Sequence, residues 1–117
     1  MGRAKVEVLR ERLRDANPGC EVEAVRDFLT AETADEILDA RRADVVVDYI
    51  DSWRDKVALL RACDARRLPV VVCGAAGGRR DATAVRVHWG DLDVCGDPLL
   101  RATRKREAAW ESAIRLV

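Results

Sequence analysis

The sequence has little of several features that mark common classes of protein. Its 117 residues include 21 Lys and Arg and 21 Asp and Glu, so the formal net charge is zero. The broad positive surface of a dedicated nucleic-acid binder is therefore missing, although a local basic patch is compatible with this balance. No apolar run approaches the roughly 18 residues that a membrane span needs, and the first 15 residues contain no apolar signal core. We expect a cytoplasmic protein without a membrane segment.

Closely paired cysteines are also missing, and histidine is sparse. The cysteines are Cys20, Cys63, Cys73 and Cys95, none of which forms a C-x-x-C pair, and His88 is the only histidine. A structural zinc site normally uses closely paired ligands, so this spacing argues against zinc. We expect each cysteine to be a small buried thiol in a reducing compartment.

Strand-like and helix-like patterns alternate along the chain and predict the fold class. Helices are expected at residues 3–16, 33–42, 52–67 and 97–116, and strands at residues 20–25, 44–50, 69–74 and 83–89. The strands at 44–50 and 69–74 are almost continuously apolar, which is typical of a parallel sheet covered on both faces. We therefore predict one domain, residues 1–117, with an α/β fold: a doubly wound, mainly parallel sheet flanked by helices.

Acidic residues and a glycine turn lie where the two apolar strands are expected to end. Ligands of open parallel sheets bind outside the carboxyl ends of the strands, which makes Asp51 a candidate site residue. Cys73 and Gly74 end the next strand, and the two ends are expected to be neighbours if the strands pair through a right-handed crossover. Asp48 faces the other side of an ideal strand. It then needs a partner in the helix layer, or it lies at a frayed strand end.

Each of these features also has a purely structural interpretation. Asp51 can cap the helix that follows, because Asp and Ser are good N-cap residues. The segment "GAAGG", residues 74–78, is either a tight turn or a phosphate-binding turn, and its spacing departs from G-x-G-x-x-G. The basic run "RATRKREAAW", residues 101–110, is either a solvated helix face or a contact for an RNA backbone. The residue types alone leave these alternatives open.

Several stretches, taken in order, resemble one family. They are "GRAKVEVLRERLRDANPGCEVEAV", "DVVVDYIDSWRDKVALLRAC", "LPVVVCGAAGGRRDATAVRVHWGDL" and "DPLLRATRKR". The first two resemble the ThiF/MoeB-type enzymes, the bacterial relatives of ubiquitin-activating enzymes. The last two are similar to one branch of that family, the tRNA threonylcarbamoyladenosine dehydratases. The resemblance spans almost the whole chain and implies a Rossmann-like nucleotide-binding fold.

The resemblance implies an ATP-dependent reaction on tRNA. Members of the family adenylate a carboxylate and release pyrophosphate. In the tRNA branch, the carboxylate of threonylcarbamoyladenosine is activated in this way and then cyclises with loss of water. Asp51 matches the family acid that engages Mg²⁺-ATP, so it is the candidate catalytic, ATP-binding and magnesium-binding residue. Lys5 matches the lysine that contacts the ATP phosphates.

Further residues match the tRNA branch without an implied chemical step. Gly74, Gly77 and Gly78 match its glycine turn, which shapes the crevice beside the nucleotide, and Gly74 is the candidate cofactor-binding position among them. The basic run would hold the tRNA backbone. The candidate tRNA contacts are Arg101, Arg104 and Lys105.

The family also has parts that these residues do not contain. It opens with a strand and a G-x-G-x-x-G loop around the phosphates, followed by a ribose-binding acid and an Asn-Arg-Gln segment. The tRNA branch also has a cysteine-containing segment after the long helix, so this chain resembles the middle of such an enzyme. Without the first strand, we expect an exposed apolar edge that invites a second copy or a full-length homologue to pair with it. Without the phosphate loop, we expect little or no ATP-dependent activity from residues 1–117 alone.

Three other functions fit parts of the pattern. A non-catalytic, truncated paralogue that acts as a dimerisation or docking module shares the fold and the family, and it is the main alternative. A receiver domain also ends a central strand in Asp, but here the next strand ends in Cys73 and Gly74, and the later "HWGD" offers no lysine. An NAD(P)-binding half-domain would carry its glycine fingerprint at the start of the chain, where none occurs.

Overall fold

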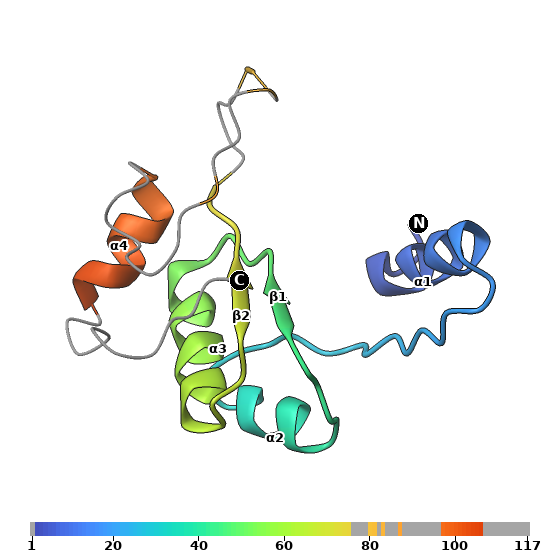
Figure 1. The fold of residues 1–117 in the computed structure, drawn as a ribbon, viewed down its shortest axis with the longest axis horizontal. Coiled ribbons are helices and arrows are strands. Elements are labelled where there is room, and N and C mark those ends of the chain that lie inside the picture. The colour runs from blue at the N-terminus through green and yellow to red at the C-terminus, as the bar shows by residue number, and fades with distance from the viewer. Residues whose placement is uncertain (1, 76–79, 82, 84–86, 88–96, 107–117) are drawn as a thin grey trace.

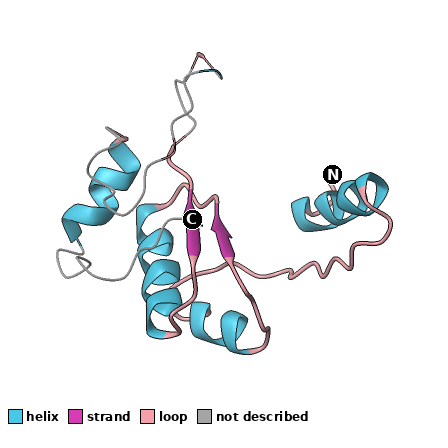
Figure 2. Ribbon diagram, viewed as in Figure 1, coloured by secondary structure: helices cyan, strands magenta, loops and turns pink. Residues whose placement is uncertain are grey.

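The computed structural model describes residues 2–75, 80, 81, 83, 87 and 97–106. In these residues, helices and strands alternate after an N-terminal helical segment (Figures 1 and 2). The elements are α1 Lys5–Ala16, α2 Ala34–Asp39, β1 Val46–Asp48, α3 Trp53–Ala65, β2 Val70–Val72 and α4 Pro98–Arg106.

Strands β1 and β2 form a parallel pair. Val46, Val47 and Asp48 lie opposite Val70, Val71 and Val72. Helix α3 connects the two strands along the chain, as a parallel pair requires. The predicted parallel arrangement of these two segments is confirmed, and so is the mixed α/β fold class. Both strands are shorter than expected, at three residues each.

The core lies between helix α3 and this sheet. Leu59, Leu60, Cys63 and Val70 are buried and form one cluster. Helix α3 was predicted with an apolar stripe, and spacings of three and four residues bring Leu59, Leu60 and Cys63 onto one face, against Val70 of β2. Surrounding apolar side chains from α2, both strands and the connecting loops pack against the cluster: Leu29, Leu38, Val46, Ile50, Leu68 and Val72.

Ion pairs join α2 to the C-terminal end of α3, in the lower part of Figure 1. The Arg66 guanidinium, just after α3, contacts the carboxylates of Asp35 and Asp39 in α2, each at 2.7 Å. The two contacts use different nitrogens of one guanidinium, which favours a fixed orientation of α2 against α3. These pairs are partly exposed, so their contribution to stability is small beside that of the apolar cluster.

The strand predicted at residues 20–25 is wrong. These residues are described and contain no strand. In the part of the chain that the structure describes, no strand lies beside them to take their backbone hydrogen bonds. Side chains hold the segment instead: Arg14 donates to the Val22 carbonyl at 3.4 Å, and Glu23 pairs with Arg41 at 2.6 Å. Cys20 is consequently exposed rather than buried.

Other expectations differ at their boundaries or lie outside the described residues. The short helix ends at Asp39 rather than at residue 42. Most of the strand expected at 83–89, and the part of the last helix beyond Arg106, lie outside the described residues, as does Cys95. No helix in the described ranges is long and apolar enough to cross a membrane.

Helix α1 stands apart from the sheet (Figure 1). None of its residues is buried, and Leu9 and Leu13 of its predicted apolar stripe are 56% and 45% exposed. On the sheet, Val45 and Val47 are 47% and 48% exposed. The apolar surface expected beside β1 is therefore present.

The C-terminus of α3 generates a prediction about stability. Arg67 has a positive φ of 54°, and Leu68 donates to the Cys63 carbonyl at 2.9 Å, as in a Schellman cap. Because glycine adopts this backbone conformation without steric cost, Arg67→Gly is expected to raise the free energy of unfolding by about 0.5–1 kcal/mol. Urea denaturation measures the change.

The matched control is Ala65→Gly, in the last turn of the same helix. There glycine only removes helix propensity, and we expect a loss of about 1 kcal/mol. A loss of stability in Arg67→Gly as well would contradict the assigned cap.

Candidate functional site

The carboxyl ends of β1 and β2 lie side by side because the strands are parallel. The Cys73 N–H, just after β2, donates to the Asp48 carbonyl at 2.9 Å and extends the ladder to this edge. Asp51 follows β1 by three residues, and Gly74 follows β2 by two. The structure therefore brings the predicted Asp51 and Gly74 to the same edge of the sheet.

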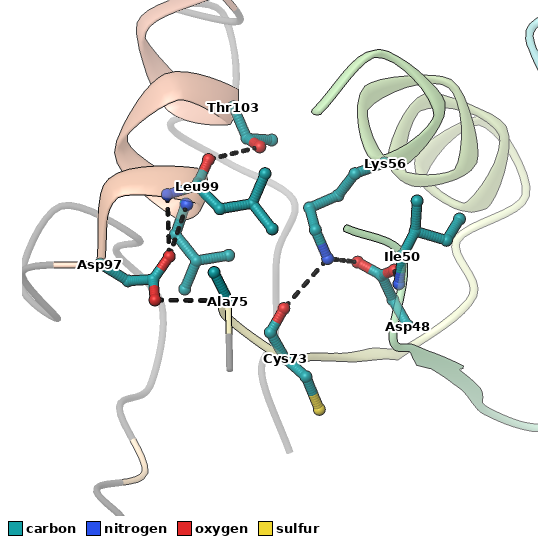
Figure 3. A network of polar contacts seen from close by, with 9 residues as sticks. Asp48, Ile50, Lys56, Cys73, Ala75, Asp97, Leu99 and Thr103 are labelled. Carbon is teal, nitrogen blue, oxygen red and sulfur yellow. Dashed lines mark hydrogen bonds and ion pairs between the residues drawn. The ribbon is translucent and has the colours of Figure 1, made fainter. Parts of the chain in front are cut away.

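A fully buried ion pair lies directly beneath this edge. The Lys56 ammonium contacts the Asp48 carboxylate at 2.5 Å, and both side chains are 0% exposed. The ammonium also donates to the Cys73 carbonyl at 3.0 Å (Figure 3). The second carboxylate oxygen of Asp48 accepts from the Ile50 N–H at 2.8 Å. Lys56 of α3 therefore contacts the last residue of β1, Asp48, and the first residue after β2, Cys73.

The contacts of Asp48 and Lys56 satisfy the physical requirements of two buried charges. Removing an ion from water costs several kcal/mol, and a close counter-ion with extra hydrogen bonds offsets that cost. Here each partner has one hydrogen bond beyond the pair: Asp48 to the Ile50 N–H and Lys56 to the Cys73 carbonyl. The sequence left two alternatives for Asp48, a partner in the helix layer or a frayed strand end. The structure shows the first of these, and the partner is Lys56.

A second buried carboxylate, that of Asp97, contacts the backbone just after β2. Asp97 is 5% exposed and immediately precedes α4. One of its oxygens accepts from the N–H groups of Leu99 and Leu100, at 2.9 and 3.1 Å, and so caps the helix. The other accepts from the Ala75 N–H at 3.1 Å (Figure 3). Asp97 thus ties the start of α4 to the turn after β2.

The close approach of Asp97 explains the glycine at position 74. A Cβ placed on Gly74 would lie 2.6 Å from a carboxylate oxygen of Asp97. Only glycine leaves room for this contact, because real Cβ atoms do not approach an oxygen so closely. Gly74 therefore has a demonstrable packing role, and any contact with a nucleotide stays a prediction. Gly77 and Gly78 lie outside the described residues.

Asp51 does not cap helix α3. The N-cap residue is Ser52, and no side-chain hydrogen bond caps the helix. The Asp51 side chain is exposed, and no contact in the described part of the chain engages its carboxylate. The capping interpretation is therefore wrong, and a carboxylate open to solvent remains at the strand edge.

The remaining candidate residues lie on helices α1 and α4 and not at the strand ends. Lys5 is exposed at the first residue of α1, which Figure 1 shows apart from the sheet. Arg101 and Lys105 are exposed on α4, and Arg104 is half-buried there. In the described ranges, no three His, Cys, Asp or Glu side chains gather closely enough to hold a metal ion.

Sequence reasoning missed Lys56 and Asp97, although both leave a signal. Lys56 precedes Leu59, Leu60 and Cys63 by three, four and seven residues, so it belongs to the apolar stripe of α3. A charge in that stripe indicates a buried partner. Asp97 stands directly before Pro98, and Asp followed by Pro is a pattern typical of a helix start.

Burial beside this ion pair also affects the nearest thiol. Cys63 is buried in the core cluster, and burial raises the pKa of its thiol to about 11, with a smaller contribution from the Asp48 carboxylate. The thiol therefore stays protonated at neutral pH and is a packing group rather than a nucleophile.

The contact between Gly74 and Asp97 yields a prediction. Gly74→Ala is expected to lower the free energy of unfolding by about 1–3 kcal/mol, because the new methyl group displaces the Asp97 carboxylate. The matched control is Gly19→Ala, where the nearest atom to an added Cβ is 3.6 Å away. That change is expected to stay within about 0.5 kcal/mol. Equal effects of the two substitutions in urea denaturation would contradict the close approach.

Comparison with known proteins identifies the family of this chain. The model of the ThiF family matches residues 1–109. The tRNA threonylcarbamoyladenosine dehydratase of Escherichia coli (strain K12) is 39% identical over 107 residues, which cover 91% of this chain and 39% of that protein. The enzyme of the same name from Haemophilus influenzae is 35% identical and covers 89% of this chain and 39% of its own length.

Solved structures show the same likeness. The E. coli tRNA N6-threonylcarbamoyladenosine dehydratase, TcdA, in complex with ATP superimposes with a TM-score of 0.81 at 39% identity, covering 91% of this chain and 43% of that one. A structure described as TcdA (CsdL) gives a TM-score of 0.82 at 37% identity, covering 93% and 42%. The chain thus spans about two fifths of the length of the curated relatives it matches. The match over residues 1–109 confirms the resemblance found in the sequence, and the chain belongs to the ThiF family.

Proposed function

We propose that this chain forms part of an ATP-dependent tRNA threonylcarbamoyladenosine dehydratase. The main support is the likeness to a relative that was solved with ATP, and the position of Asp51 is consistent with it. The E. coli relative solved with ATP matches this chain at 39% identity with a TM-score of 0.81, and the present fold carries an open carboxylate, Asp51, where a parallel sheet binds ligands. The substrate is a tRNA that bears threonylcarbamoyladenosine, and the reaction takes place in the cytoplasm.

The chemistry follows from the poor leaving ability of a carboxylate oxygen. Transfer of AMP from ATP to the threonylcarbamoyl carboxylate releases pyrophosphate and creates a mixed anhydride. A nucleophilic atom of the same threonylcarbamoyl group then bonds to the activated carbonyl carbon, loses its proton and expels AMP. The substrate thereby loses the elements of one water, which are taken up in the conversion of ATP to AMP and pyrophosphate. Mg²⁺ bound with ATP supplies positive charge between the triphosphate and nearby acids.

Asp51 is suited to hold such a magnesium–nucleotide complex. Its carboxylate is exposed, follows the end of β1 and has no partner among the described residues. Carboxylate oxygens are the ligands that Mg²⁺ prefers in proteins. Asp48, by contrast, is fully buried and already paired with Lys56. Asp51 is therefore the acid that reaches the nucleotide, and Asp48 belongs to its support.

Lys5 and the basic run complete the proposed contacts. Lys5 is exposed at the start of α1 and would contact the phosphates of ATP, where its charge offsets negative charge on the departing pyrophosphate. Arg101 and Lys105 are exposed on α4 and would face the RNA backbone. Asp97 ties α4 to the turn after β2, so such an RNA contact would be held at a set place beside the nucleotide.

The second candidate is a non-catalytic module that docks on another copy or on a full-length homologue. The apolar side chains exposed beside β1 and on α1 favour it. Val47 and Leu9 represent these two surfaces, at 48% and 56% exposed. The two candidates differ in whether chemistry occurs, so turnover decides between them.

The proposal predicts an effect of Asp51 on turnover when a relative supplies the segments of the enzyme that residues 1–117 do not contain. In a hybrid, the 107 residues of this chain that match the E. coli relative replace the corresponding segment of that protein. Pyrophosphate release is measured with ATP and threonylcarbamoyladenosine-bearing tRNA. The hybrid is expected to turn over, and Asp51→Asn is expected to lower kcat/KM by roughly 100-fold or more, because one ligand of the metal–nucleotide complex is lost. Residues 1–117 alone should release little pyrophosphate, because they contain no G-x-G-x-x-G loop.

The matched control is Asp44→Asn, an exposed acid just before β1, near the opposite end of the strand. It is expected to leave turnover unchanged. A hybrid that folds but releases no pyrophosphate would favour the docking module. Equal turnover in the Asp51 and Asp44 variants would remove Asp51 from the site.

The second prediction concerns the basic run. In the same hybrid, reversal of Arg104 and Lys105 to Glu is expected to weaken tRNA binding and to flatten its dependence on salt, because fewer counterions are released. The control reverses Arg12 and Arg42, which are exposed on other parts of the chain. Unchanged salt dependence after the first reversal would make the run an ordinary solvated surface.

A further inference from the structure

Neither the sequence analysis nor the proposed reaction gives the Lys56 ammonium a role. It comes from α3, yet it contacts the Asp48 carboxylate in β1 and the Cys73 carbonyl after β2 (Figure 3). We propose that Lys56 is a positioning residue that holds the two strand ends flanking the nucleotide and thereby sets the place of Asp51. This inference rests on the proposed function, because it concerns the same site.

The contacts lead from Lys56 toward Asp51 in three short steps. The ammonium contacts one carboxylate oxygen of Asp48 at 2.5 Å. The other oxygen of Asp48 accepts from the Ile50 N–H at 2.8 Å, which ties the backbone two residues further on to the same carboxylate. The next residue is Asp51. The direction in which Asp51 leaves the sheet therefore depends on a carboxylate that Lys56 orients.

The same ammonium determines how the second strand end lies. It donates to the Cys73 carbonyl at 3.0 Å, while the Cys73 N–H donates to the Asp48 carbonyl at 2.9 Å. On the far side, the Asp97 carboxylate accepts from the Ala75 N–H at 3.1 Å. Residues 73–75 are thus held by a cation on one side and by a carboxylate on the other, with Gly74 between them.

Fold stability alone gives little reason for this arrangement. Replacing a buried ion pair by apolar side chains of similar volume is often neutral or stabilising, because the charges need no longer be desolvated. An apolar side chain at position 56 would fill the stripe beside Leu59 and Leu60 equally well. It would make no directional contact with Asp48 or with the Cys73 carbonyl, however. What the ion pair adds is the fixed orientation of the two strand ends.

The test uses the ¹⁵N-labelled 117-residue chain and two readouts by nuclear magnetic resonance. The first is the backbone order parameter of Ile50, Asp51 and Gly74. The second is the paramagnetic broadening of their amide signals by Mn²⁺·ATP, which detects weak nucleotide binding and gives an apparent Kd. In the parent chain we expect order parameters near about 0.85, typical of rigid backbone, and selective broadening at these amides.

Three variants distinguish positioning from general support. Lys56→Met is expected to lower the three order parameters below about 0.6, the flexible range, and to raise the apparent Kd for Mn²⁺·ATP roughly tenfold or more. Lys56→Arg keeps the charge and is expected to restore both readouts in part. Thr103→Val is the control, because Thr103 is also fully buried but its hydroxyl donates within α4, to the Leu99 carbonyl, and to no other residue that the structure describes.

A double variant keeps the test decisive if Lys56→Met leaves too little folded protein. Asp48→Asn with Lys56→Met removes both charges, so no ion is left buried without a partner, while the contact to the Cys73 carbonyl is still lost. Loss of order at Asp51 and Gly74 in this folded variant supports the inference. Order parameters and broadening equal to those of the parent overturn it.

The outcome also separates this inference from the proposed function. If Mn²⁺·ATP broadens no amide near Asp51 in the parent, or broadens them equally in Asp51→Asn, nucleotide binding at this edge is rejected. The order parameters of the Lys56 variants then still decide whether Lys56 holds the strand ends. If the parent binds and the Lys56 variants bind equally well, Lys56 is no positioning residue and the nucleotide site stands.

Discussion

The contact between Lys56 and Asp48 is the interaction on which the rest of the site depends. Two charges without exposure to water lie at 2.5 Å, beneath the edge where both strands end. Such a pair is tolerated only with good geometry and further hydrogen bonds, and the Ile50 N–H and the Cys73 carbonyl supply them. The two strands are only three residues long. Their relative position at this edge therefore depends on side chains as much as on the backbone ladder.

The parts of the fold that the sequence predicted are those in which a local pattern decides the structure. The apolar runs around Val46 and Val70 gave two parallel strands, and the apolar stripe of α3 gave the helix between them. Residues 20–25 show the limit of such patterns. Alternation indicates that a segment can form a strand, but a strand also needs a neighbour, and none lies beside these residues in the described part of the chain.

The sequence predicted which strand ends form the candidate site, but not the buried side chains that hold them. The rule that ligands bind at the carboxyl ends of parallel strands pointed to Asp51 and Gly74, and both residues follow such strand ends in the structure. Their contact with a nucleotide stays a prediction. Lys56 was missed because a lysine on a surface helix is usually solvated, and only its place in the apolar stripe shows otherwise. Whether Asp51 or Ser52 is the N-cap depends on where the helix begins to within one residue, and residue propensities do not resolve helix ends that finely.

The central claim is that one buried ammonium joins the two strand ends, and the side-chain NH₃⁺ signals of the lysines test it most directly. The chain has three lysines, Lys5, Lys56 and Lys105, of which Lys5 and Lys105 are exposed and serve as internal references. The account predicts that the Lys56 ammonium exchanges its protons with water far more slowly than the other two and shows nuclear Overhauser contacts to protons of Asp48 and Cys73. A Lys56 ammonium that exchanges as fast as that of Lys5 would contradict it.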